Sequence, residues 1–182
     1  MKIILASASP RRQELIRQIT AEVTADPADV EEIVPEGMPL TERPEYLAHI
    51  KAAAVAVRHP EEMVLGCDTG VFIDGQMIGK PKDRADAARI LRQLSGRVHQ
   101  VITGCCLINN GQERRFSEVT DVEFYPLSDQ QIEAYLDQGE YRDKAGAYGI
   151  QGPGALLVKG IRGDFYNVMG LPVGRLAQEL AK

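Results

Sequence analysis

The first segment with side chains suited to chemistry is SASPRR at residues 7–12, which follows a short apolar run. Its two guanidinium groups, its two hydroxyls and the backbone N–H groups of a helix start are all groups that bind phosphate oxygens. The same pattern is also typical of a serine helix cap followed by two solvated arginines. The local sequence therefore leaves two interpretations open, a phosphate site and an ordinary helix start.

A second segment, GCDTG at residues 66–70, places Asp68 at the end of an apolar run. Polar groups at strand ends often form the reactive site of an α/β protein. An aspartate there could bind a divalent cation, accept a proton from water, or do both. An aspartate that caps a turn would show the same pattern, so these roles stay open at this point.

Two further segments combine polar groups with a constrained or permissive backbone. Lys80 lies in GKPKD at residues 79–83, where Pro81 restricts the chain, and it could neutralise phosphate charge or simply be an exposed loop lysine. The segment DKAGAYGIQG at residues 143–152 permits close backbone approach at its glycines, and Gln151 could hydrogen-bond a base edge. A flexible glycine turn is the alternative, and the Walker and dinucleotide-binding patterns are absent.

Hydrophobic periodicity predicts a chain in which strands, helices and hairpins alternate. We expect a strand and loop within residues 20–40, and hairpins at the Asp-Gly and Asn-Gly pairs of residues 74–75 and 110–111. Asp83 and Ser128 are predicted helix N-caps. The other predicted strands span residues 3–6, 63–68, 71–73, 77–78, 99–109, 116–125 and 155–159, and the predicted helices span 13–18, 43–59, 83–95, 129–138 and the tail from residue 173. This order indicates a mixed-sheet α/β or α+β fold in one domain over residues 1–182.

Composition excludes several classes of protein. The chain has 182 residues and a net charge of −5, which disfavours a general nucleic-acid binder. No apolar run is long enough to span a membrane and no signal peptide is evident, so we expect a cytoplasmic protein. The three cysteines suggest buried thiols, and the three histidines lack metal-ligand spacing in the sequence.

These segments, in this order and together with LSGRVH at residues 94–99, resemble the Maf family of nucleoside triphosphate pyrophosphatases over essentially the whole chain. The resemblance implies hydrolysis of the α–β phosphoanhydride, which releases a nucleoside monophosphate and pyrophosphate. It also implies a divalent cation, Mg²⁺ or Mn²⁺, and a homodimer. The implied fold is an elongated mixed sheet with flanking helices and two lobes around a deep cleft, similar to the inosine-triphosphate pyrophosphatases.

The resemblance also assigns roles to individual residues. Asp68 matches the proton acceptor, and we expect it to bind the metal as well. Glu32 matches an acid near the metal, with Glu31 as a rival. Cys67 and Gly70 depart from the family, which commonly has alanine and an apolar β-branched residue there. The groups that match the substrate site are Ser7, Arg11, Arg12, Lys51, Thr69, Lys80 and Gln151.

Arg11, Thr69 and Gln151 match the subfamily that prefers dTTP and UTP, so the resemblance implies a pyrimidine nucleotide as substrate. Modified pyrimidine nucleotides are possible substrates under the same reading. The alternative function is a non-catalytic, nucleotide-binding regulator of cell division, since the family is associated with septum formation. That alternative predicts nucleotide binding without metal-dependent turnover.

Overall fold

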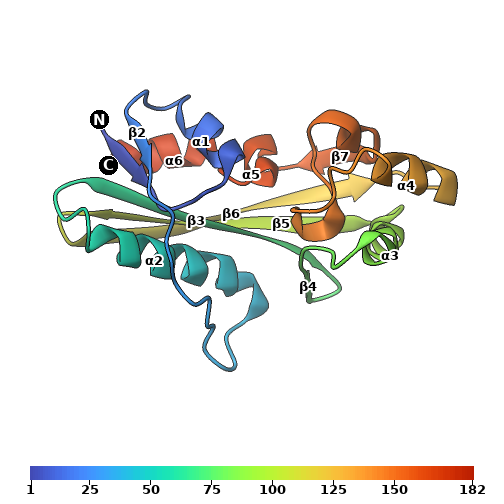
Figure 1. Cartoon of the computed structure of the whole chain (residues 1–182), viewed down its shortest axis with the longest axis horizontal. Helices are drawn as coiled ribbons and strands as arrows, with labels where there is room; N and C mark the ends of the chain where they lie inside the picture. The colour runs from blue at the N-terminus through green and yellow to red at the C-terminus, as the bar shows by residue number, and fades with distance from the viewer. The chain divides into compact units, whose positions relative to one another are not determined.

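The computed structural model describes all residues from 1 to 182 as a mixed sheet with helices packed on it (Figure 1). The strands are β1 (Ile3–Leu5), β2 (Val23–Ala25), β3 (Met63–Ile73), β4 (Gln76–Ile78), β5 (Val98–Asn109), β6 (Gln112–Phe124) and β7 (Val158–Arg162). The α-helices are α1 (Pro10–Ile16), α2 (Arg43–Ala56), α3 (Arg84–Leu94), α4 (Asp129–Leu136), α5 (Phe165–Met169) and α6 (Val173–Leu180). Three 3₁₀ turns cover Leu40–Glu42, Ala145–Ala147 and Gly152–Leu156.

The sheet has seven strands in the order β2-β1-β3-β5-β6-β7, and β4 pairs with β3. Strand β1 is parallel to β2 and to β3, whereas β4 is antiparallel to β3 and β7 is antiparallel to β6. The sheet is therefore mixed, as the alternation of strands, helices and hairpins predicts. None of the helices is long and apolar enough to cross a membrane.

Local sequence signals explain the turns and helix starts. Asp74 and Gly75 both have positive φ, 52° and 69°, and so do Asn110 and Gly111, at 47° and 74°. Two consecutive positive φ angles are what a tight two-residue hairpin needs, which confirms both predicted hairpins. The predicted caps are also present, because Asp83 accepts from the backbone N–H of Asp86 and Ser128 forms a capping box with Gln131.

Two strand predictions are wrong. Residues 63–68 and 71–73 form one continuous strand, β3, so Asp68 lies inside a strand rather than at its end. Gly70 leaves room for the ring of Phe72, because a Cβ there would lie 2.7 Å from it. The predicted strand at 155–159 lies later, at Val158–Arg162, because the Gly-Pro-Gly run from residue 152 forms a 3₁₀ turn.

The chain divides into two compact units, and we describe each by itself. Unit 1 comprises residues 1–69, 102–118 and 166–182, and unit 2 comprises residues 70–101 and 119–165. In unit 1, α2 covers one face of the sheet, and α1 and α6 lie on the other (Figure 1). The helix α2 approaches closely because Gly66 and Gly104 lie beneath it, and a Cβ at either would collide with its backbone. The apolar cluster under α2 contains Ile4, Ala6, Ala48, Ala52, Val55, Val64 and Cys106.

Unit 2 is built around a buried aromatic cluster. The rings of His99, Phe124 and Tyr148 meet edge to face, with centroids 4.7–5.4 Å apart. His99 Nε2 lies 2.7 Å from the hydroxyl of Tyr148, and the hydroxyl of Tyr135 accepts from Gly149 N. These contacts hold the glycine-rich segment against the strands of this unit.

Candidate functional site

Asp68 lies where β3 continues beyond its neighbour β1. The register pairs Leu5, the last residue of β1, with Leu65, so β1 no longer flanks the strand at Asp68 and Thr69. Successive side chains of a strand point to opposite faces. Accordingly Asp68 contacts Lys51 of α2 on one face, and Thr69 contacts Arg12 of α1 on the other. Strand alternation thus divides the candidate residues of unit 1 into two sets, one on each face of β3 beyond the end of β1.

On the α2 face, one ammonium joins two carboxylates. Lys51 Nζ lies 2.7 Å from Asp68 Oδ1 and 2.8 Å from Glu32 Oε1. The side chains of Lys51 and Asp68 are each only 15% exposed, whereas that of Glu32 is 51% exposed. Of the two rival acids, Glu32 is therefore the one whose carboxylate reaches this group. The pairing could not be read from sequence, because Glu32 lies in an acidic run with no regular structure.

Burial raises the pKa of Asp68 above the ordinary value for an aspartate. The neighbouring charges of Lys51 and Arg12 oppose this shift, and Glu32 adds to it. Desolvation disfavours the charged form of a carboxyl group, whereas a nearby cation favours it. Asp68 is therefore more basic than an exposed aspartate, and its basicity depends on Lys51.

On the α1 face, Arg12 is held by three hydrogen bonds. Its Nε donates to the carbonyl of Gly170 at 2.8 Å, and its two terminal nitrogens donate to Ser7 Oγ at 3.3 Å and Thr69 Oγ1 at 3.0 Å. A guanidinium has five N–H donors, so donors remain for a ligand. Ser9 also caps α1 by accepting from the backbone N–H of Arg12. Residues 7–12 therefore do form a capped helix start, and Arg12 in its first turn is held in one orientation by its hydrogen bonds.

A row of polar groups that the sequence did not single out supports this arginine. Thr103 Oγ1 lies 2.9 Å from Thr69 Oγ1 and donates to the carbonyl of Asn167 at 3.0 Å. Thr103 and Asn167 are fully buried, and both stand as polar residues within apolar stretches of the sequence. That contrast is the only sequence signal that could have identified them.

The remaining predicted residues are more exposed. Arg11 lies half-buried in the first turn of α1. Lys80 is exposed between β4 and α3, and Gln151 is exposed at the start of a 3₁₀ turn, both within unit 2. Their two loops are joined by a hydrogen bond from Gly146 N to Gly79 O of 3.1 Å.

Comparisons with known proteins agree on one family. The family described as "Maf-like protein" matches residues 2–182. A relative from Latilactobacillus sakei named dTTP/UTP pyrophosphatase is 50% identical over 180 residues, covering 97% of this chain and 98% of the relative. A protein of the same name from Symbiobacterium thermophilum is 49% identical, covering 100% of this chain and 93% of the relative.

Solved structures resemble the fold at much lower identity. A nucleoside-triphosphatase, or dITP/XTP pyrophosphatase, from Mycobacterium abscessus has a TM-score of 0.50 at 20% identity, covering 100% of this chain and 97% of that chain. The Ham1 protein of Staphylococcus aureus has a TM-score of 0.50 at 17% identity, covering 69% and 73%. At these identities the likeness shows a shared fold, which confirms the predicted fold class.

Proposed function

Since this chain belongs to the Maf-like protein family, we propose that it is a nucleotide diphosphatase that hydrolyses dTTP and UTP to the monophosphate and pyrophosphate. Its relatives named dTTP/UTP pyrophosphatase are about half identical to it over nearly their full length. One observation carries the proposal. The largely buried Asp68 lies 2.7 Å from the ammonium of Lys51, and the next residue of its strand, Thr69, contacts Arg12. This arrangement supplies a base beside cationic groups, which phosphoanhydride hydrolysis requires.

A divalent cation fits the α2 face of the site. Asp68 and Glu32 each offer a carboxylate oxygen to the same ammonium, so two hard oxygen donors already converge around one positive charge. Mg²⁺ and Mn²⁺ prefer such oxygen ligands. We propose that Asp68 and Glu32 would hold the cation, which when bound neutralises charge on the substrate phosphates.

The protein's own groups do the rest of the work in this proposal. Asp68 orients the attacking water and takes its proton, and a raised pKa makes it a better base near neutral pH. Arg12 and Lys51 stabilise the negative charge that moves to the pyrophosphate leaving group. Ser7 orients Arg12 through the 3.3 Å hydrogen bond between them. Arg11 and Lys80 contribute further positive charge to the triphosphate.

Thr69 and Gln151 select the base in this proposal, together with Arg11. A site that hydrogen-bonds its substrate discriminates strongly, because a wrong base leaves polar groups unpaired. The hydroxyl of Thr69 already contacts Arg12 and Thr103, so its position is set by the protein before any nucleotide binds.

We also propose that residues 1–182 act as one catalytic domain and that the protein is a homodimer. Sedimentation analysis can measure this oligomeric state.

The decisive test compares Asp68→Asn with Asp74→Asn in the full-length protein. Asp74 lies at the exposed tip of a hairpin, where asparagine tolerates the positive φ of 52°. We expect Asp68→Asn to lower dTTP turnover by about 10²-fold or more and Asp74→Asn to leave it unchanged. Near-normal turnover by a folded Asp68→Asn protein would end the proposed role of Asp68.

A product assay tests the reaction itself. Pyrophosphate and the monophosphate should appear in equal amounts, and only with a divalent cation present. Release of orthophosphate alone would indicate a phosphatase. Tight dTTP binding with no metal-dependent turnover would indicate the non-catalytic regulator instead.

A further inference from the structure

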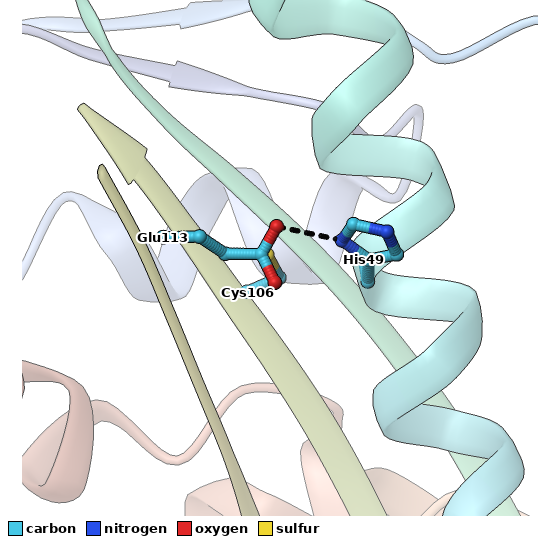
Figure 2. Close-up of side chains that lie close together, drawn as sticks. All are labelled: His49, Cys106 and Glu113. Atoms are coloured by element: carbon cyan, nitrogen blue, oxygen red, sulfur yellow. Dashed lines mark ion pairs between the residues drawn. The ribbon is translucent and has the colours of Figure 1, made fainter. Parts of the chain in front are cut away.

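Three potential metal ligands meet on the α2 face of unit 1, away from the residues assigned above (Figure 2). His49 comes from α2, Cys106 from β5 and Glu113 from β6. One ligand atom from each lies within 4.8 Å of the other two, and His49 Nδ1 lies 2.9 Å from Glu113 Oε2. Cys106 and Glu113 come from the two strands of one hairpin, whereas His49 comes from a helix much earlier in the chain, so histidine spacing alone gives no sign of the cluster.

We propose that His49, Cys106 and Glu113 bind a thiophilic divalent cation of the Zn²⁺ type. An imidazole, a thiolate and a carboxylate are the donors that Zn²⁺ takes in proteins, at about 2.0–2.3 Å. Tetrahedral ligands at those bond lengths lie about 3.5 Å apart. A pair of ligand atoms at the upper limit of 4.8 Å must therefore close by about 1 Å, and the His49–Glu113 pair at 2.9 Å must open by about 0.6 Å. Three protein ligands leave the fourth position for water.

The surroundings of the His49 imidazole support a cation site here. Its Nδ1 is closed off from solvent and makes no hydrogen bond of acceptable geometry, although the Glu113 carboxylate lies 2.9 Å away. The short distance and the missing hydrogen bond are compatible, since the oxygen is near the nitrogen but poorly aligned with it. Buried polar atoms are rarely left without a partner in native proteins. A cation between the imidazole and the carboxylate would satisfy both.

The sulfur donor of Cys106 determines which class of cation fits. Burial raises the pKa of the Cys106 thiol to about 12, and the carboxylates of Glu113 and Glu45 act in the same direction. A metal must therefore displace the thiol proton, which soft-binding Zn²⁺ can do and Mg²⁺ does not. Arg115 forms an ion pair with Glu113 and therefore competes with a metal for that carboxylate.

This site is separate from the proposed catalytic cation. His49 lies two residues before Lys51 on α2, yet it contacts β6, whereas Lys51 contacts β3. A metal here would join α2 to the β5–β6 hairpin and leave Asp68 untouched. We therefore expect Zn²⁺ to stabilise the fold without supporting hydrolysis, since a ligand that binds only the folded state raises its stability.

Cobalt substitution tests the site in the full-length protein. After chelation, Co²⁺ is titrated and the thiolate-to-cobalt charge-transfer absorption is recorded. We expect one equivalent of Co²⁺ to produce the band, Zn²⁺ to displace it, and Zn²⁺ to raise the thermal unfolding midpoint. Cys106→Ser should abolish the band, and Glu113→Gln, on the exposed hairpin, should weaken Co²⁺ binding by about 10-fold or more.

Two matched variants serve as controls. Cys105→Ser removes the neighbouring buried thiol, whose sulfur lies 3.7 Å from that of Cys67, and His59→Gln removes another half-buried histidine. Both should keep the cobalt band. Absence of the band in the folded wild-type protein, or its persistence in Cys106→Ser, would overturn the proposal. If the wild-type protein binds Co²⁺ as expected but does not hydrolyse dTTP, the proposed function is wrong and this site still stands.

Discussion

A single methyl group at Gly66 should disturb both stability and catalysis. An ideal Cβ there would lie 2.1 Å from the carbonyl oxygen of Ala48 and 2.8 Å from the nitrogen of Ala52, both in the backbone of α2. Ordinary contact begins at 3.4 Å, so in Gly66→Ala the helix must retreat by about 1.3 Å. Backbone atoms cannot rotate away as a flexible side chain can, so the helix moves as a unit.

The displacement reaches the site because α2 carries Lys51. Its hydrogen bond to Asp68, now 2.7 Å, would lengthen to about 4.0 Å if the lysine moved with the helix. We expect Gly66→Ala to cost about 1–3 kcal/mol of unfolding free energy through overpacking. A shift of this size should also lower dTTP turnover by about 10–100-fold.

Denaturant unfolding and steady-state dTTP hydrolysis measure the two effects. Gly174→Ala is the matched control, because a Cβ there meets nothing within 4 Å and the residue lies in α6. We expect that control to be fully active and as stable as the wild type or slightly more stable, since alanine favours helix. If Gly66→Ala matched the wild type in both assays, the close packing of α2 on β3 would be refuted.

Three further predictions follow from side chains described above. Lys51→Met removes the cation that lowers the pKa of Asp68, so the acid limb of the pH–turnover profile should move to higher pH; an unchanged profile would exclude coupling between the two groups. Arg12→Lys cannot keep three directed hydrogen bonds and should lower kcat/KM for dTTP by about 10–100-fold, whereas Arg17→Lys at the exposed end of α1 should not. Burial lowers the pKa of His99 to about 4 from 6.5, so the unfolded chain takes up the proton first and stability falls as the pH drops through that range, by about 3 kcal/mol in all. His99→Gln should remove that part of the pH dependence in denaturant titrations, and an unaltered dependence would assign it to other groups.

Much of the local structure was predictable from sequence, because it depends on neighbouring residues. The hairpins at Asp74 and Asn110 need only two consecutive residues that accept positive φ. The caps Asp83 and Ser128 bind backbone groups three residues away. The order of short motifs along the chain likewise predicts the candidate residues.

How those candidates group in space depends on the tertiary packing. Asp68 and Thr69 are adjacent in sequence, but strand alternation directs them to opposite faces, one toward Lys51 and the other toward Arg12. The sequence predicts a strand end at Asp68, since a polar residue usually marks a strand end. The strand continues instead, and the shorter β1 leaves its edge open there.

Long-range packing is the reason for this difference. Turns and helix caps can be predicted from sequence, since they depend on short-range sterics and hydrogen bonds. The pairing of Lys51 with Glu32 and Asp68 depends instead on how closely α2 approaches β3 over Gly66. The meeting of His49 with Cys106 and Glu113 likewise requires α2 to pack on a hairpin that lies much later in the chain. No local pattern encodes such distances, because they arise only when the core closes.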